Sequence, residues 1–359
     1  MPNVYEKLRE RLDMFPQGFP ETKSGVELEI LEHLFTADEA KIATSLRPFP
    51  EPVSTIAERL ERDENELGDI LYDMSKRGLI LRYKESEEVI YYFLAAWMVG
   101  VWEFQVKNLA QDNIKLYERY FEEGLVPLNK ERKVGGFRVI PVQKEIKDNT
   151  EVQPYEKVSE VIDAHTRFAV TDCICRKEAT MLSEGCDKLM ETCMTFGVAA
   201  DYYIENEIGR EITKEEAKEI LQKAEEDGLV HFSSNHAEDK IFMCNCCGCC
   251  CKALAAINKY DNPGLIVKSN YYALVDTNTC DGCETCTERC QVNAIQVEND
   301  LASVSMSKCI GCGLCVSTCP NESLSMIHKE PDALSHIFAN DFELMQARGE
   351  DTKRPYPFE

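Results

Sequence analysis

The chain has 359 residues, of which 64 are aspartate or glutamate and 40 are lysine or arginine, so its formal net charge is −24. This length exceeds what one hydrophobic core usually organises, and two or three domains are expected. The acidic balance is the opposite of a nucleic-acid-binding footprint and favours partners with basic surfaces. The N-terminus lacks the basic and then apolar pattern of a secretory signal, so we expect a cytoplasmic protein.

Short helices followed by a two-stranded ribbon are expected in the N-terminal part of the chain. The helices are predicted over 30–46, 53–60 and 64–76. Gly78 ends the last helix, and two segments rich in β-branched and aromatic residues then flank the polar turn 84–88. This order resembles a winged-helix domain.

The third predicted helix argues against DNA binding by this part of the chain. Asp63 gives it a capping-box-like start, at the position that enters the major groove in DNA-binding relatives. Between Glu61 and Lys76, however, six residues are acidic and two are basic, so phosphate would repel this helix. A structural or protein-docking role is therefore favoured. Three nearby basic residues that could still touch a DNA backbone are Arg77, Arg82 and Lys84.

Two further stretches bear on organisation. The most apolar run, residues 91–106, includes Glu103 and falls short of the about 20 apolar residues that span a bilayer, so a buried helix is predicted there. The polar stretch 144–154 has the composition of a linker, and we place a domain boundary near residue 150.

Eight cysteines near the C-terminus repeat one spacing twice. Each run reads C-x2-C-x2-C-x3-C, and the second begins 29 residues after the first and is followed by Pro320. With this spacing, three thiolates of one tight loop can bind three irons of a cubane while the fourth cysteine reaches the other cluster. The first run is Cys280, Cys283, Cys286 and Cys290, and the second is Cys309, Cys312, Cys315 and Cys319.

These runs resemble the bacterial-type ferredoxins that carry two 4Fe–4S clusters, so a ferredoxin-like dicluster domain is expected over 271–330. The resemblance implies one cluster on Cys280, Cys283, Cys286 and Cys319, and the other on Cys309, Cys312, Cys315 and Cys290. Glycines 282, 311 and 313 suit a loop that wraps closely on sulfide. Gln291 stands where the family usually has proline, which is expected to alter the local turn and the reduction potential but not ligation. The alternative is that the clusters only cross-link a small domain.

Ten more cysteines lie between residues 151 and 270. In a reducing cytoplasm so many thiols are an oxidation liability unless a metal holds them. We predict one or two further iron–sulfur clusters, with one larger cluster or a four-cysteine zinc site as alternatives. The simplest partition gives one site to each of two segments, although neighbours such as Cys246 and Cys247 point differently and can serve separate sites. The ten are Cys173, Cys175, Cys186, Cys193, Cys244, Cys246, Cys247, Cys249, Cys250 and Cys251. The arrangement resembles multi-cluster 4Fe–4S binding proteins of strict anaerobes.

Other candidate residues carry weaker signals. Arg176 and Lys252 each follow a cysteine and could approach a cluster, but surface charge is the favoured interpretation. His165, His231 and His236 have no ligand-like spacing, and ordinary histidines are favoured over cluster ligands. The sequence has no dinucleotide fingerprint, phosphate-binding GK[ST] loop or HExxH motif, so electrons are expected to enter and leave through protein partners.

The sequence as a whole predicts an α+β multidomain protein. Its parts are a winged-helix-like domain with following helices (1–150), a cysteine-rich α/β middle domain (151–270), the ferredoxin domain (271–330) and a helical C-terminal tail (331–359). The expected function is to relay single electrons between redox partners, as an electron-transfer subunit of an oxidoreductase complex rather than an independent enzyme. No catalytic residue, transmembrane segment or nucleic-acid partner is predicted. The alternatives are a reductase with a substrate-binding middle cluster and an iron–sulfur-sensing winged-helix regulator.

Overall fold

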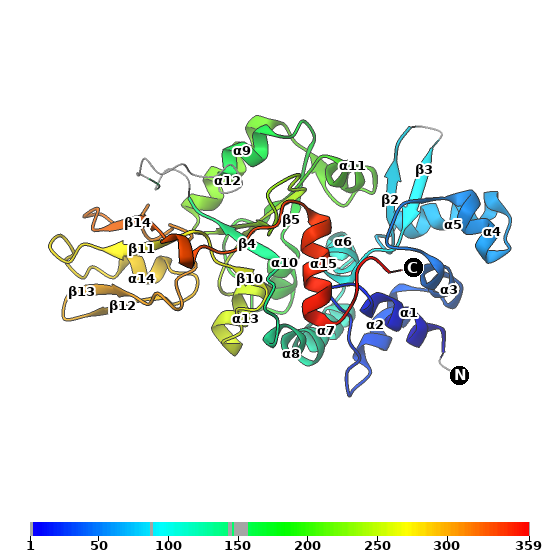
Figure 1. Cartoon of the computed structure of the whole chain (residues 1–359), viewed down its shortest axis with the longest axis horizontal. Helices are drawn as coiled ribbons and strands as arrows, with labels where there is room; N and C mark the ends of the chain where they lie inside the picture. Colours follow the sequence, from blue (N-terminus) through cyan, green and yellow to red (C-terminus); the bar gives the residue numbers. More distant parts are fainter. Residues whose placement is uncertain (1–2, 87–88, 143–145, 147–156, 359) are drawn as a thin grey trace. The chain divides into compact units, whose positions relative to one another are not determined.

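A computed structural model describes residues 3–86, 89–142, 146 and 157–358 (Figure 1). Contacts divide the chain into two compact units. Unit 1 comprises Met1–Lys133, Val198–Arg210 and Met345–Glu359, and unit 2 comprises Val134–Gly197 and Glu211–Leu344. This division falls between Lys133 and Val134, whereas the boundary predicted near residue 150 lies outside the described residues. The division of unit 2 into middle and ferredoxin domains stays a prediction.

Unit 1 is mainly helical and contains one small sheet. Its helices are α1 (Val4–Asp13), α2 (Val26–Leu34), α3 (Ala37–Ser45), α4 (Val53–Leu60), α5 (Glu64–Lys76), α6 (Trp102–Phe104), α7 (Gln111–Tyr120), α8 (Val126–Lys130) and α11 (Val198–Glu205). The sheet has the order β1-β3-β2, with β1 (Glu51–Pro52), β2 (Leu81–Lys84) and β3 (Ile90–Phe93). The helices expected over 53–60 and 64–76 and the ribbon that follows them thus occur where expected, while the winged-helix assignment itself stays a prediction.

Two helix predictions in unit 1 were wrong in detail. The helix expected over 30–46 is two helices, because the chain is extended at Phe35 and Thr36 starts α3 by accepting the Glu39 N–H. Most of the run 91–106 is buried, although Val99 is exposed, and the run is not one helix. It continues from β3 into an irregular turn over Trp97–Val101, whose interior dihedral angles are not helical, and then into α6.

Helix α5 has the predicted bounds because both of its ends are encoded locally. The Asp63 carboxylate accepts the N–H groups of Asn65 and Glu66, and Gly78 follows the helix with a φ of 72°. Two of the three basic residues that could touch a DNA backbone form ion pairs within unit 1. Arg77 pairs with Asp73, and the buried Arg82 pairs with Glu205 at 3.0 Å.

Unit 2 is built on a seven-stranded sheet of order β10-β4-β8-β9-β6-β5-β7. The strands are β4 (Phe137–Ile140), β5 (Phe168–Asp172), β6 (Glu191–Phe196), β7 (Arg210–Glu211), β8 (Val230–Ser234), β9 (Phe242–Cys246) and β10 (Ile266–Val267). Its helices are α9 (Val158–Asp163), α10 (Ile174–Met181), α12 (Lys214–Glu226) and α13 (Lys252–Tyr260). β10 pairs parallel with β4, and the pairs β4–β8, β8–β9, β9–β6 and β6–β5 are antiparallel.

Side chains alternate between the two faces of this sheet. Met194, Phe196 and Met243 pack with α9 and α12 into one buried cluster. Val139, Phe232 and Cys246 pack on the opposite face with Leu254 of α13. Figure 1 shows α9 and α12 on one side of β4 and α13 on the other. The cysteines of β6 and β9 therefore share this second face, because they alternate with Met194 and Met243 along their strands.

The ferredoxin part consists of two short ribbons and one helix. β11 (Tyr271–Val275) pairs with β14 (Leu324–His328), and β12 (Ile295–Glu298) pairs with β13 (Leu301–Val304). Helix α14 (Thr285–Arg289) ends beside Cys290. Within the described residues 331–358 of the predicted helical tail, only α15 (Asp341–Thr352) and a turn at Pro331–Ala333 are helical, and residues 334–340 between them are not.

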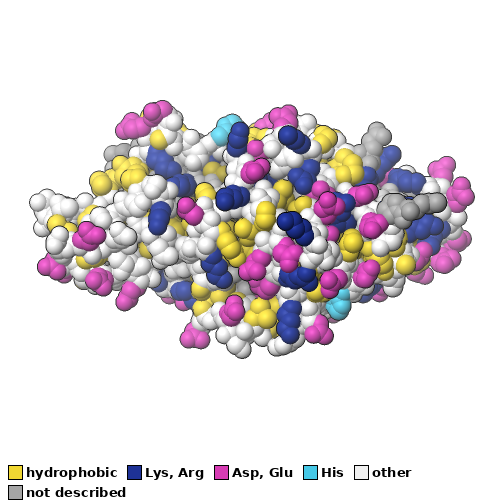
Figure 2. Space-filling view, turned by 90° about the horizontal axis from the view of Figure 1, so that it is seen from below, with side chains coloured by type: hydrophobic (Ala, Val, Ile, Leu, Met, Phe, Trp, Pro, Cys, Tyr) yellow, Lys and Arg dark blue, Asp and Glu magenta, His cyan; other side chains and the backbone are white. Residues whose placement is uncertain are grey.

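Among the described residues, no helix is both long enough and apolar enough to cross a membrane. Figure 2 shows lysine and arginine side chains interspersed with aspartate and glutamate on the face drawn. The strong net negative charge therefore does not exclude basic side chains from this surface.

Candidate metal centres

The first ferredoxin quartet lines a single pocket. Cys280 and Cys283 come from the loop before α14, Cys286 lies in α14, and Cys319 comes from the second run. Val275, Val297, Ala302 and Leu324 complete apolar walls of the pocket. The structure thus brings together the four cysteines that the ferredoxin resemblance grouped, in surroundings suited to a cluster.

The second quartet is the counterpart of the first. The buried Cys315 has Cys312, Cys290 and Cys309 as its titratable neighbours, together with Cys286 of the first quartet. Burial raises the pKa of the Cys312 thiol to about 12. Because a metal ligand must be a thiolate, cluster binding at this quartet has to release protons.

Backbone N–H groups donate to cysteine sulfurs in both quartets. The Ala294 nitrogen lies 3.2 Å from Cys290 Sγ, and the Ser323 nitrogen lies 3.3 Å from Cys319 Sγ. Each donor is four residues after its cysteine, so the two halves repeat the same local geometry. Such N–H donors help to set the reduction potential of a bound cluster.

Glycine is required where these loops wrap closely. Gly311 has a φ of 73°, and a Cβ built there would lie 2.1 Å from the Tyr271 carbonyl oxygen. Gly282 has a φ of 69°, and its Cβ would lie 2.6 Å from the Asp300 backbone. Any side chain would push these loops apart, which accords with the close wrapping expected from the sequence.

Six of the ten middle cysteines converge on the sheet face that α13 covers. Cys244 and Cys246 alternate along β9, and the antiparallel pairing of Met194 with Met243 places Cys193 opposite Cys244. Cys173 precedes α10, Cys175 lies in its first turn, and Cys251 precedes α13. We call this set the six-cysteine group: Cys173, Cys175, Cys193, Cys244, Cys246 and Cys251.

The sulfurs of the six-cysteine group are joined by hydrogen bonds. Cys175 bonds Cys173 and Cys251, Cys246 bonds Cys251 and Cys244, and Cys244 bonds Cys193. Hydrogen bonds from Cys175 and Cys246, with backbone N–H groups of the first turn of α13, hold the pKa of Cys251 well below its usual range. A helix N-terminus stabilises a thiolate in this way, so Cys251 favours the anionic form although it is buried. The hydrogen bonds that lower the pKa of Cys251 raise the pKa of its partners Cys175 and Cys246.

The other four middle cysteines form a tight cluster, here the four-cysteine group: Cys186, Cys247, Cys249 and Cys250. Their four sulfurs all lie within 4.8 Å of one another. Cys250 Sγ lies 3.7 Å from Cys186 Sγ and 3.6 Å from Cys249 Sγ, and Cys186 Sγ lies 3.9 Å from Cys247 Sγ. The structure therefore divides the ten cysteines six and four across both segments, and the simplest partition, one site per segment, is not the observed one.

Arg176 lies between the two groups, so its interpretation as surface charge was wrong. Its side chain is fully buried and contacts Cys247 of the four-cysteine group, and Cys173 and Cys246 of the six-cysteine group lie near it. Its Nη2 donates to the Asn245 carbonyl oxygen at 2.8 Å, and its Nη1 donates to the Leu189 carbonyl oxygen. A buried cation beside both sulfur sets offsets part of their negative charge.

The surface interpretation of Lys252 was also wrong. Lys252 is buried, and its Nζ lies 3.6 Å from Glu178 Oε2, which is fully buried as well. The histidines bond ordinary polar groups. His165 Nδ1 lies 2.9 Å from the Val161 carbonyl oxygen, and His231 Nδ1 lies 2.5 Å from Asn245 Oδ1. These contacts agree with the interpretation of both as ordinary histidines.

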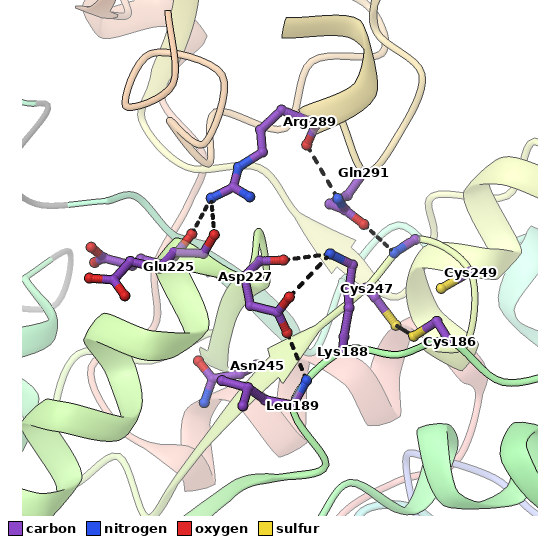
Figure 3. Close-up of polar contacts among 12 residues, drawn as sticks. Cys186, Lys188, Leu189, Glu225, Asp227, Asn245, Cys247, Cys249, Arg289 and Gln291 are labelled. Atoms are coloured by element: carbon purple, nitrogen blue, oxygen red, sulfur yellow. Dashed lines mark hydrogen bonds and ion pairs between the residues drawn. The ribbon is translucent and has the colours of Figure 1, made fainter. Parts of the chain in front are cut away.

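A direct junction joins the ferredoxin part to the four-cysteine group (Figure 3). Gly248, between Cys247 and Cys249, donates its N–H to Gln291 Oε1 at 2.7 Å. A Cβ at Gly248 would lie 2.2 Å from the Gln291 carbonyl oxygen. The Asn258 side-chain amide holds the two segments together, because it donates to the backbone carbonyl oxygens of Gly248 and Gln291, each at 3.0 Å. Gln291, the departure from the ferredoxin pattern, thus contacts the glycine that lies between two of the middle cysteines.

Residues 273–326 match the family model described as a 4Fe-4S dicluster domain. This match confirms the ferredoxin-like identification for that part of the chain, which is a 4Fe–4S dicluster domain. Comparisons with curated proteins and with solved structures returned no match.

Proposed function

We propose that this chain relays single electrons between redox partners through the dicluster domain and an iron–sulfur site at the six-cysteine group. The observation that carries the proposal is a shared core. Cys246 and Cys251 are buried in the same apolar cluster as Ile310 and Leu314, with Cys290, Cys309 and Cys312 packed against it. Cys290 and Cys309 also border the core around Cys286 and Cys315. The six-cysteine group and the two ferredoxin quartets therefore lie along two contiguous apolar cores.

The proposed ligand sets follow the structural grouping. One 4Fe–4S cluster is assigned to Cys280, Cys283, Cys286 and Cys319, and the other to Cys290, Cys309, Cys312 and Cys315. Iron–sulfur clusters accept and donate one electron at a time at potentials set by charge, hydrogen bonds and exposure. The chain contributes N–H donors, apolar walls and the buried Arg176 charge, all of which tune those potentials.

The first quartet is the proposed contact point for a partner. Cys283 is exposed, whereas Cys286 and Cys315 are buried. Asp281 and Glu284 flank Cys283 and are also exposed. A redox partner with a basic surface would be attracted to this acidic rim, and the attraction would weaken as salt screens it.

The test compares Cys283→Ser and Cys312→Ser with the exposed Ser303→Ala on protein purified without oxygen. Iron, acid-labile sulfide and the paramagnetic resonance of the dithionite-reduced protein would be measured, together with the rate of electron transfer to an added acceptor protein. Each cysteine variant is expected to lose cluster signal and transfer while residues 1–150 stay folded, and Ser303→Ala is expected to behave as wild type. Unchanged transfer in a protein lacking both ferredoxin clusters would refute the relay.

A second candidate is a reductase whose six-cysteine group handles a small substrate. It is favoured by the number of sulfurs, since six thiols exceed the four that bind a simple cubane. Addition of candidate substrates to the reduced protein should then change the spectrum of this site while leaving the ferredoxin signals alone. A spectrum unaffected by every compound tried would count against it.

A further inference from the structure

We propose that the four-cysteine group, Cys186, Cys247, Cys249 and Cys250, binds a single tetrahedral metal ion, zinc or iron, rather than a 4Fe–4S cluster. The proposal concerns a site separate from the relay and does not depend on it. It starts from the separation of the sulfurs. Four sulfurs at about 2.3 Å from one central ion form a tetrahedron whose edges are about 3.8 Å. Three sulfur–sulfur separations at this site are 3.6, 3.7 and 3.9 Å.

A cubane would need more room between the sulfurs. Each cysteine of a 4Fe–4S cluster binds a different iron at a different corner, so the sulfurs are held apart by the whole cluster. The dicluster domain provides an internal comparison. Across the described part of the chain, only the four-cysteine group brings three or more ligand atoms all within 4.8 Å of one another, and neither ferredoxin quartet does so.

The chain around the four-cysteine group is built like a closed structural site. Cys247 and Cys250 have the C-x2-C spacing of a metal knuckle, and Cys186 joins them from 61 residues earlier. Cys247 and Cys250 are buried with Ala224 and Leu229, and Cys186 packs against this cluster. Arg176 contacts Cys247 and offsets the excess negative charge that four thiolates leave on a divalent ion.

The geometry also gives the ion a structural task. The ion would hold the loop after β9 against the loop after α10. The loop after β9 also contains Gly248, whose N–H donates to Gln291. A closed four-thiolate site of this kind contributes to folding and leaves no open position for a substrate.

The first experiment measures metals in the whole chain purified without oxygen. Cys249→Ser removes the most exposed of the four sulfurs, and Asp187→Asn, an exposed change beside Cys186, is the matched control. Cys249→Ser is expected to lower the metal content by up to one ion per chain with no loss of acid-labile sulfide. Asp187→Asn is expected to change neither the metal content nor the sulfide content. If the lost ion is zinc, the site is a zinc site; if it is iron without sulfide, it is a single-iron site. Loss of four irons with four sulfides would overturn the proposal, and so would retention of every metal in a variant that also lacks Cys186.

X-ray absorption on the wild-type chain decides the matter even if the variants misfold. At the zinc edge we expect four sulfur neighbours at about 2.3 Å and no neighbouring metal. If zinc is absent, reconstitution with cobalt should give the intense visible bands of tetrahedral cobalt thiolate at one ion per chain. The single-ion site would be rejected if three results coincide. The protein would contain no zinc, it would contain no iron beyond the iron that is matched by sulfide, and it would fail to bind one cobalt ion per chain.

Discussion

Gln291 Oε1 accepts the Gly248 N–H at 2.7 Å, and this bond joins the residue after a ferredoxin cysteine to the residue between two middle cysteines. Gln291→Ala would leave the part-buried Gly248 donor without this acceptor. We expect the free energy of unfolding of unit 2 to fall by about 1 kcal/mol. Slower electron exchange between the ferredoxin clusters and the six-cysteine group is expected as well, because the two loops would be held together less tightly, with the Asn258 hydrogen bonds still in place.

The control for this prediction is Gln296→Ala, an exposed glutamine in β12. Denaturant unfolding measures the stability, and rapid-mixing reduction followed at each cluster's signal measures the exchange. If Gln291→Ala and Gln296→Ala exchange electrons equally fast, the junction has no role in coupling.

Arg176 is expected to affect the potential of the six-cysteine group. Arg176→Gln removes a buried positive charge beside Cys173 and Cys246, so the more negative reduced state loses stabilisation and the midpoint potential should fall. Because two backbone carbonyl oxygens lose their donor, a destabilisation of about 3 kcal/mol is also expected. Redox titration against Arg167→Gln, a partly exposed arginine, separates the effects: lost stability with an unchanged potential would mean a purely structural role.

We expect the free energy of unfolding of unit 2 to depend on pH through His236. Burial, and then the charge of Lys240, lower the pKa of His236 below its usual range of about 6.5. Asp341 and Asp239 act in the opposite direction but do not prevail. Since the folded pKa is depressed, the neutral ring contributes stability that is present above about pH 6.5 and is lost as pH falls through the folded pKa.

His236→Gln should therefore be less sensitive to pH than wild type between about 7.5 and 5.5, where one proton changes stability by at most about 1.4 kcal/mol per pH unit. Denaturant midpoints at the two pH values measure the difference. Parallel curves for wild type and variant would show that His236 does not titrate with folding.

Asp63 should matter for unit 1 alone. Asp63→Ala removes the acceptor for two N–H groups at the start of α5 and should cost about 1 kcal/mol. Asp69→Ala, an exposed acidic residue within the same helix, is expected to change stability by less than about 0.5 kcal/mol. Both tryptophans, Trp97 and Trp102, lie in unit 1, so their fluorescence reports its unfolding. Equal midpoints for the two variants would contradict the capping role.

Features encoded by neighbouring residues could be predicted from the sequence. Helix α5 has the expected bounds because its start and stop signals are local. The dicluster domain could be identified because its spacing carries the ligand pattern within two short loops. The helix break at Thr36 is also local, since Thr36 and Glu39 form a capping box that a reading of apolar spacing alone overlooks.

The grouping of the middle cysteines could not be predicted, because it depends on contacts between distant segments. Cys193 meets Cys244 through strand pairing, and Cys186 meets Cys247 across 61 residues. One local signal was present: Cys244 and Cys246 alternate as side chains on one face of a strand do, which separates both from Cys247. The burial of Arg176 had no such signal, since an arginine after a cysteine is equally compatible with the surface.

The apolar cluster shared by Cys246, Leu254, Ile310 and Leu314 has a consequence for protein engineering. A bacterial-type ferredoxin domain is often regarded as a self-contained unit that can be transferred from one protein to another. Here, removal of residues 273–326 would expose apolar side chains on α13 and on the sheet. The excised fragment would expose the apolar side chains that pack against them. Neither fragment should remain monomeric, so the dicluster domain of this chain is not a transplantable part.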